Sequence, residues 1–269
     1  MITALTLAPV LAAILIMALP EARARMVALG GALVSLALTV CMLTRFDLAE
    51  TGIQFQEKFN WIPALGIDYF VGLDGLNALV LLLAALLAPL VVLASWKHTD
   101  RPRTYFALLG LLFTGLFGTF TALNFFHWFL YWELALVPAF FLIKLYGTGE
   151  DRHRAALNFF LFTVVGSVAM LLGFLFIYQQ TKTFDFITLS KMGVDVSPWV
   201  FCAVLLGLWV KVPMAPLHIW QAPAYAAAPA PVAMLLTGVM SKMGVYGFLR
   251  LVVPNFPAHL QHYATVLMA

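Results

Sequence analysis

The chain has 269 residues, of which 63% are hydrophobic and only 10% charged, and its mean hydropathy is +0.97. A typical soluble domain carries roughly 25% charged residues, so this composition excludes a soluble globular enzyme and a disordered chain. The formal net charge of +3 is too small to hold a phosphate backbone strongly, which excludes a nucleic-acid-binding domain.

Eight apolar stretches, separated by clusters of charged residues, indicate an all-α polytopic membrane protein. Each is long enough to cross a hydrocarbon core of about 30 Å as a helix. We expect helices at about 3–20, 26–44, 72–95, 104–123, 125–146, 154–179, 198–221 and 229–252. No basic residue precedes the first stretch and no convincing cleavage site follows it, so we expect a span there and not a removable signal peptide.

The connections between these stretches are short, apart from 45–71 and 180–197. Connection 45–71 carries six charged residues, and we expect a short hairpin or an interfacial element within it. After the eighth helix and the turn PNFPAH, a new apolar run, YATVLMA, rises only about 10 Å as a helix and cannot cross the bilayer. We therefore expect 254–269 to be the incomplete start of a further helix.

Lysine and arginine are distributed unevenly between the two sides of the membrane. The first, third and fifth connections, with the helix ends beside them, hold eight basic residues, against five on the opposite side. The eight are Arg23, Arg25, Lys97, Arg101, Arg103, Lys144, Arg152 and Arg154. Because basic residues favour the cytoplasmic side, this bias predicts a multi-pass protein of the bacterial inner membrane with a periplasmic N-terminus.

Three charged residues fall near the centre of predicted spans, namely Glu133, Lys211 and Lys242. Each opposes membrane insertion by about 2.5–3.5 kcal/mol, so each is expected to face protein or a water-filled cavity. One hypothesis is a structural ion pair between Glu133 and Lys211 that joins two helices. The other is a proton relay, since a buried lysine releases its proton readily and a nearby carboxylate opposes that release.

The predicted helix that carries Lys211 is interrupted by proline. Pro213 and Pro216 follow within one and a half turns, and proline removes backbone hydrogen bonds and kinks helices. Unwound backbone at membrane depth is tolerated beside protein or a water-lined cavity, and broken helices mark ion pathways. His218 would share the face of Lys211 on a continuous helix, so it either extends the relay towards the cytoplasm or packs as a hydrogen-bonded residue.

Other polar and small residues favour structural roles. Asp74 lies at the outer end of the third predicted helix, where a capping or interfacial role is expected. His127 belongs to the aromatic run FFHWFLYW, which is typical of an interfacial belt. The small residues Gly115 and Gly118 allow close helix packing. The two cysteines have no metal-ligand spacing, and we predict no metal site.

Four stretches resemble one protein family: GLDGLN at 72–77, FLYWELALVP at 129–138, KVPMAPLHIW at 211–220 and APAPVAMLLTGVMSKMGVYGFLR at 228–250. They are similar to the antiporter-like, proton-translocating subunits of respiratory complex I, in particular the NADH:quinone oxidoreductase chain M or subunit 4 family. The resemblance covers nearly the whole chain, but only the N-terminal part of the family's length of about fourteen helices.

The resemblance implies roles for the charged residues. A glutamate pairs with the lysine of a broken helix, and a second lysine continues a hydrated path; these roles fall on Glu133, Lys211 and Lys242. It implies protons as the transported ion and other membrane subunits as partners, with redox chemistry elsewhere and no cofactor in this chain. It also implies three N-terminal helices over 1–103 and a first antiporter-like repeat over 104–253.

The chain departs from the family pattern after the broken helix. Pro223, Tyr225 and Ala227 stand where the family has aspartate, histidine and glutamate, which removes polar groups from the connection. Two further hypotheses therefore stay open. One is a subunit of a sodium/proton antiporter or a membrane-bound hydrogenase, and the other is a non-pumping structural membrane subunit.

Overall fold

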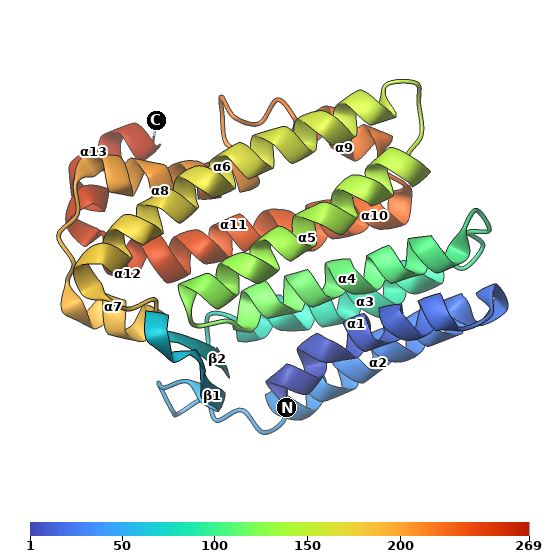
Figure 1. The fold of residues 1–269 in the computed structure, drawn as a ribbon, viewed down its shortest axis with the longest axis horizontal. Helices are drawn as coiled ribbons and strands as arrows, with labels where there is room; N and C mark the ends of the chain where they lie inside the picture. Colours follow the sequence, from blue (N-terminus) through green and yellow to red (C-terminus); the bar gives the residue numbers. More distant parts are fainter. Residues whose placement is uncertain (269) are drawn as a thin grey trace.

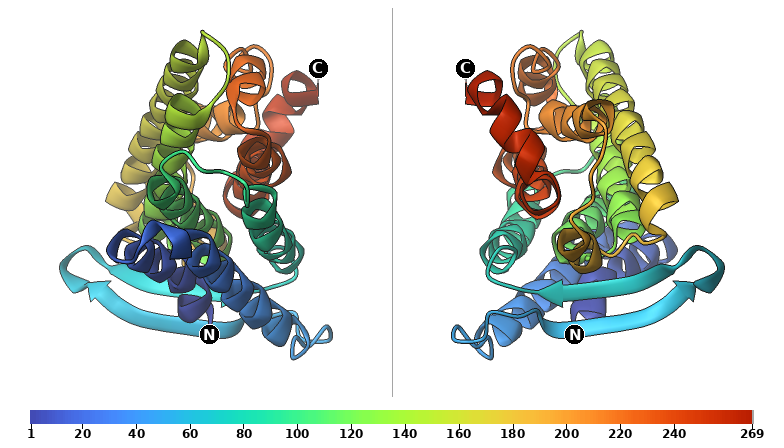
Figure 2. Two further views of the ribbon diagram at one scale, coloured as in Figure 1. Left: turned by 90° about the vertical axis from the view of Figure 1, so that its right-hand side faces the viewer. Right: turned by 90° about the vertical axis from the view of Figure 1, so that its left-hand side faces the viewer.

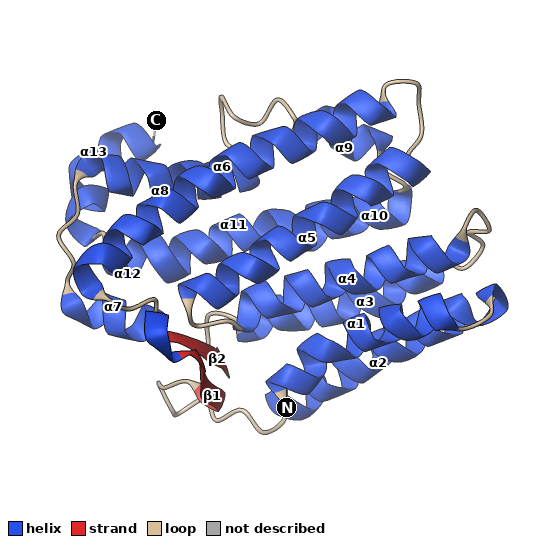
Figure 3. Ribbon diagram, viewed as in Figure 1, coloured by secondary structure: helices blue, strands red, loops and turns tan. Residues whose placement is uncertain are grey.

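A computed structural model describes residues 1–268 and shows a bundle of long apolar helices with a two-stranded sheet at one end (Figure 1 and Figure 3). Within the described residues, five helical segments are long and apolar enough to cross a membrane. They cover Glu21–Leu43, Pro102–Thr121, Phe125–Tyr146, Arg152–Thr181 and Ala230–Asn255. Three shorter apolar helices cover Ile2–Ala18, Ala78–Ala94 and Pro198–Lys211. The helical membrane class is confirmed, whereas eight full spans remain a prediction.

The helices follow the predicted order along the chain. The first half holds α1 (Ile2–Ala18), η1 (Glu21–Arg23), α2 (Ala24–Leu43), α3 (Ala78–Ala94), α4 (Pro102–Thr121) and α5 (Phe125–Tyr146). The second half holds α6 (Arg152–Thr181), α7 (Phe186–Met192), α8 (Pro198–Lys211), α9 (Gln221–Ala227), α10 (Ala230–Leu235), η3 (Leu236–Met240), α11 (Ser241–Gly247), η4 (Phe248–Val252), α12 (Val253–Asn255) and α13 (Pro257–Met268). The segments η3 and η4 are π-helical turns, so α10 to α12 form one continuous span with two local changes of pitch.

Several predicted helix ends are wrong for local reasons. The third helix begins at Ala78 and not near residue 72, because the residues before it pair as a strand. The seventh helix ends at Lys211 instead of continuing to 221. Connection 180–197 contains the short helix α7, whose first turn is capped by the carboxylate of Asp185. The predicted turn PNFPAH is mostly helical, since α13 already begins at Pro257, and Ala269 lies outside the described residues.

The long second connection forms a β-hairpin, which confirms the first of the two structures expected there. Strand β1 (Gln54–Ile62) pairs antiparallel with β2 (Ile67–Leu73). Gly66, with a φ of 59°, supplies the left-handed residue of the turn, where glycine avoids steric strain. Figure 2 shows the hairpin lying across the end of the bundle where the N-terminus lies. Within residues 1–268 the predicted helical class therefore holds, with this one two-stranded sheet as the only strand structure beside the helices.

Small residues set the closest helix contacts, as the sequence predicts. A Cβ added to Gly115 would lie 2.6 Å from the backbone nitrogen of Ala135, and one added to Gly118 would lie 2.2 Å from the ring of Tyr131. Helix α4 therefore packs directly on the backbone of α5. Because lipid tails leave little hydrophobic drive for helix association, such close packing supplies much of the attraction between spans.

The two ends of the bundle differ in composition. The connections between α1 and α2, α3 and α4, and α5 and α6 lie together at one end (Figure 1). These connections, together with the helix ends beside them, carry the eight basic residues on which the predicted orientation depends. The hairpin and α7 lie at the opposite end (Figure 1). The basic connections thus share one side, as the charge bias requires.

Candidate functional site

Lys211 is the last residue of α8, at the point where the proline-rich segment breaks the helix. Its side chain is only 2% exposed. The break leaves backbone carbonyl groups without their helical donors, and other groups bond to them instead. The indole of Trp220 donates to the carbonyl of Val210 at 3.2 Å. The backbone N–H of Met214 donates to the carbonyl of Trp209 at 3.1 Å. The predicted break is confirmed, and its backbone is held in a defined shape beside a buried lysine.

The surroundings of Lys211 include Glu133, as the sequence predicts. Glu133 on α5 lies close enough for its negative charge to attract the ammonium of Lys211. No ion pair in residues 1–268 involves either of them, and neither Glu133 Oε1 nor Lys211 Nζ has a hydrogen-bond partner there. The two groups are thus neighbours whose charges are not locked into a direct contact. A buried pair of this kind can change its separation, which a locked salt bridge resists.

Trp132 and Ser167 occupy the space around these two charged groups. The ammonium of Lys211 lies over the indole of Trp132, 4.8 Å from the ring centroid. The indole nitrogen of Trp132 donates to the hydroxyl of Ser167 on α6 at 2.9 Å, and that hydroxyl also lies beside the carboxylate of Glu133. Both Trp132 and Ser167 are buried. Sequence reasoning missed them, because an aromatic residue and a serine in apolar runs carry no separate signal.

Glycine contacts between α6 and α8 fix the distance between Ser167 and Lys211. A Cβ on Gly166 would lie 3.1 Å from Val210, and one on Gly207 would lie 2.7 Å from the carbonyl oxygen of Gly166. The residues on either side of the site therefore approach at backbone distance. Such close packing leaves little room for the two helices to shift relative to each other.

Lys242 lies on α11, directly after the π-helical turn η3, and its side chain is exposed. Its ammonium donates to the carbonyl of Thr237 at 2.6 Å, and the Ser241 hydroxyl donates to the same carbonyl at 3.0 Å. A π-turn shifts the helical hydrogen-bond register and so leaves carbonyl groups open to side chains. Lys242 is therefore held by the backbone of its own helix and not by a carboxylate.

His218 does not share a helix face with Lys211, contrary to the expectation from a continuous helix. Helix α8 ends at Lys211, and His218 lies exposed in the irregular segment before α9. The geometric argument for a role in the relay therefore fails. His127, expected in an interfacial belt, is instead buried beside the rings of Tyr69 and Tyr131, with centroids 4.5 and 4.7 Å away.

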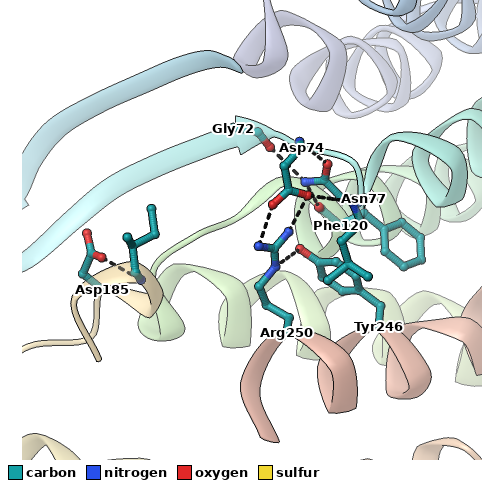
Figure 4. A network of polar contacts seen from close by, with 9 residues as sticks. Gly72, Asp74, Asn77, Phe120, Asp185, Tyr246 and Arg250 are labelled. Atoms are coloured by element: carbon teal, nitrogen blue, oxygen red, sulfur yellow. Dashed lines mark hydrogen bonds and ion pairs between the residues drawn. The ribbon is translucent and has the colours of Figure 1, made fainter. Parts of the chain in front are cut away.

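A second charged cluster joins the start of α3 to the end of the last span (Figure 4). Asp74 forms an ion pair with Arg250 at 2.7 Å, and Arg250 Nε also donates to the hydroxyl of Tyr246 at 3.1 Å. The carboxylate of Asp74 accepts the backbone N–H groups of Leu76 and Asn77. Burial acts to raise the pKa of Asp74, but the hydrogen bond and charge of Arg250 outweigh it, so the pKa is lowered.

Asn77 completes this cluster, because its amide nitrogen donates to the carbonyl groups of Gly72 and Phe120 at 3.0 and 2.9 Å (Figure 4). The cluster therefore connects strand β2, helices α3 and α4, and the span that carries Lys242. The expected capping role of Asp74 is present but incomplete. Its partner Arg250 is far away in sequence, so only a model of the packing could have joined them.

The hairpin is fastened to the bundle by charged groups of its own. Glu57 accepts the backbone N–H groups of Ile2 and Thr3 at 2.9 and 3.2 Å, which caps the start of α1. Lys58 forms ion pairs with Asp185 at 3.0 Å and with Asp68 at 3.3 Å. Burial acts to lower the pKa of Lys58, but the hydrogen bond and charge of Asp185, with those of Asp68, raise it above its ordinary value.

The residues that depart from the family pattern form contacts of a different kind. The Tyr225 hydroxyl on α9 donates to the carbonyl of Leu236, the first residue of η3, at 3.2 Å. The backbone carbonyl of Ala227 accepts the N–H of Thr148 at 2.8 Å. This connection therefore packs against the span of Lys242 and the α5–α6 loop through hydrogen bonds.

Comparison with known proteins finds similarity over nearly the entire chain. A family described as NADH:quinone oxidoreductase/Mrp antiporter, TM, matches residues 122–269. The NAD(P)H-quinone oxidoreductase chain 4 of Gloeobacter violaceus is 34% identical over 272 residues, which cover 99% of this chain and 52% of the relative. A chain 4 from a Picosynechococcus species is 36% identical, covering 94% and 49%. The chain thus spans about half the length of these curated relatives.

Two solved structures share the fold. A chain of the respiratory complex I from Thermus thermophilus with bound NADH superimposes with a TM-score of 0.87 at 31% identity, over 99% of this chain and 56% of that one. A chain of the membrane-bound sulfane sulfur reductase, an archaeal respiratory membrane complex, gives a TM-score of 0.81 at 23% identity, over 93% and 40%. At that lower identity the likeness concerns the fold alone.

Proposed function

Because the chain belongs to the NADH:quinone oxidoreductase/Mrp antiporter membrane family, we propose that it is a proton-translocating membrane subunit of a complex I-type NADH:quinone oxidoreductase. Its partners would be other membrane subunits, as in the multisubunit complexes that share its fold. Electron transfer would take place elsewhere in that complex. With the basic connections on the cytoplasmic side of a bacterial inner membrane, the N-terminus would be periplasmic.

The observation that carries this proposal is the state of Lys211. Its amine is buried at the end of a broken helix, without a hydrogen-bond partner in the described residues and without a direct ion pair to Glu133. A buried and unpaired charge is too costly to be kept for packing alone. A group that must gain and lose a proton needs this kind of site, in which neither protonation state is strongly favoured.

The proposed switch changes the distance between the Glu133 carboxylate and the Lys211 ammonium. At an effective dielectric constant of about 20, their attraction is roughly 4 kcal/mol at 4 Å and roughly 2 kcal/mol at 8 Å. A movement of this size therefore changes the proton affinity of the lysine by more than tenfold. Close approach loads a proton onto Lys211, and separation releases it.

Lys242 would receive the released proton. Its ammonium now donates to the Thr237 carbonyl, and its exposed side chain is free to move towards a hydrated path. The π-helical turn η3 supplies that carbonyl, which gives the turn a role in holding the acceptor. The order of transfer in this proposal is Glu133-controlled loading of Lys211, followed by passage to Lys242.

Glu133→Gln and Lys211→Ala test the relay in proteoliposomes that hold the intact complex. We expect both to abolish proton translocation coupled to electron transfer while the complex still assembles. Glu150→Gln and Lys191→Ala, which alter exposed charges in connections, are the matched controls and should translocate normally. Failed assembly with normal transport in each remaining complex would instead support a purely structural ion pair.

The same vesicles test which ion moves. Translocation that needs an electron donor and is unchanged when sodium is replaced by potassium is the expected result. Transport that depends on sodium and continues without a donor would contradict the proposal in favour of an antiporter. Normal proton flux after Lys242→Ala would remove that residue from the path.

A further inference from the structure

The indole of Trp132 lies against the ammonium of Lys211 in a structure where, within the described residues, that ammonium forms no ion pair with Glu133. The ammonium lies 4.8 Å from the ring centroid, and within the described residues it has no hydrogen-bond acceptor. A cation within about 6 Å of an indole face is attracted by the ring quadrupole, most strongly in a desolvated site. The ring thus replaces the missing acceptors and stabilises the charged amine.

Ser167 connects this ring to the carboxylate. Its hydroxyl accepts the indole N–H of Trp132 at 2.9 Å and lies beside Glu133. A hydroxyl has two acceptor lone pairs and one proton, so it can accept from the indole and donate to the carboxylate together. The Ser167 hydroxyl thereby holds both the indole plane of Trp132 and the carboxylate of Glu133 in place.

We propose that Trp132 forms a rest site for the protonated Lys211 side chain, and that Ser167 is the positioning residue that keeps this site and Glu133 at a fixed separation. This inference rests on the proposed function, because it assigns the second position of the switch described above. The lysine then alternates between the carboxylate and the ring face. Without the ring, the charged lysine would have no stable position away from Glu133, and release would slow.

Neighbouring residues make a structural explanation separable from this one. Trp128 is also fully buried and lies beside Trp132 with ring centroids 4.7 Å apart and planes tilted by 32°, but no cation among the described residues lies over it. Thr163 on α6 is buried, and its hydroxyl donates to the carbonyl of Phe159 in its own helix at 2.7 Å. These two residues match Trp132 and Ser167 in type and depth, but within the described residues neither forms a hydrogen bond or a cation–π contact with Lys211 or Glu133.

Fluorinated tryptophans incorporated at position 132 of the intact complex test the rest site. Fluorine withdraws electron density from the ring face and changes its shape little, while the indole N–H remains a donor. We expect the protons translocated per electron to fall stepwise as one, two and three fluorines are added, by at least tenfold in total. The same series at Trp128 should leave translocation unchanged, and Trp132→Phe should retain more of it than Trp132→Leu.

Ser167→Ala tests the positioning role, with Thr163→Val as its control. We expect a loss of at least fivefold in protons per electron for Ser167→Ala, partly restored by Ser167→Thr, and no change for the control. A flat fluorine series at 132, or an equal slope at 128, overturns the rest site. If Glu133→Gln translocates normally, the proposed function itself fails; if it does not, a flat series removes only the role of the indole.

Discussion

Replacing Asp74 with Asn removes the negative charge beside Arg250 but keeps an oxygen that can accept the backbone N–H groups before α3. The side chains of Arg250 and Asp74 are only 13% and 18% exposed. Removing one partner of a buried ion pair costs about 3–5 kcal/mol, because the other charge stays buried without compensation. Partial exposure and the bond to Tyr246 reduce this, so we expect Asp74→Asn to lower the free energy of unfolding by roughly 2–4 kcal/mol.

Asp74→Ala separates the charge from the capping function. It also removes the acceptor for the N–H groups of Leu76 and Asn77, which adds about 1 kcal/mol. Asp68→Asn is the matched control, since its carboxylate contacts the half-exposed Lys58 at 3.3 Å, and exposed pairs contribute about 0–1 kcal/mol. The expected order of stability is wild type, Asp68→Asn, Asp74→Asn and then Asp74→Ala.

Thermal unfolding in bicelles measures this order, and the double variant Asp74→Asn/Arg250→Met tests its cause. If the unpaired charge is responsible, the double variant will be more stable than Asp74→Asn alone, because no charge is then left uncompensated. Equal losses for Asp74→Asn and Asp68→Asn, or additive losses in the double variant, would refute the reasoning. Because the folded-state pKa of Asp74 is lowered, the pair stabilises the fold above about pH 4 and this contribution is lost as the pH falls further.

Three further changes follow from single contacts. Tyr246→Phe removes the acceptor of Arg250 Nε and should cost about 1–2 kcal/mol in the same unfolding assay; no loss would mean that water replaces the hydroxyl. Because the pKa of Lys58 is raised in the folded state, its ion pairs stabilise the hairpin fully below about pH 10.5 and are lost as the pH rises through the folded-state pKa. Above that pH, the loss of these ion pairs should accelerate amide exchange in the hairpin of the wild type. Lys58→Met, which lacks these ion pairs, should show no such additional acceleration. Gly207→Ala would place a Cβ 2.6 Å from a side chain of α6 and should destabilise by about 1–3 kcal/mol, whereas Gly30→Ala, with open space around it, should stabilise slightly.

The features that the sequence predicts best are those with local causes. Proline after Lys211 removes backbone donors wherever the helix lies, so the break could be placed within a few residues. Charge is costly in lipid, and hydropathy places Glu133 and Lys211 near the centres of apolar stretches, so both could be singled out as candidate site residues before any packing was known. Gly115 and Gly118 likewise predicted close helix packing, but only the structure shows that the neighbouring helix is α5.

Features that depend on distant partners were missed. The sequence predicts a hairpin or an interfacial element within 45–71 but places residues 72 and 73 in the third helix, and only their place in the strand paired with β1 shows otherwise. Arg250 reads as a charge at the end of the eighth predicted helix, and only the packing of that helix brings it against Asp74. Trp132 is missed because aromatic residues are common in spans. Only the position of the Lys211 ammonium over its ring distinguishes Trp132 from the other aromatic residues.

Lys211 and Lys242 both fall near the centre of predicted spans, yet their surroundings differ in kind. Lys211 is enclosed by α5, α6 and α8, with an indole over its amine, whereas Lys242 is exposed and relies on a carbonyl of its own helix. An exposed ammonium in hydrocarbon would cost about 2.5–3.5 kcal/mol, which one backbone hydrogen bond of about 1 kcal/mol does not offset. The environment that Lys242 requires must therefore come from water or from protein outside the described residues. Hydropathy reports only how deep a charge lies in an apolar stretch, and it is the neighbours of each lysine that distinguish the enclosed Lys211 from the exposed Lys242.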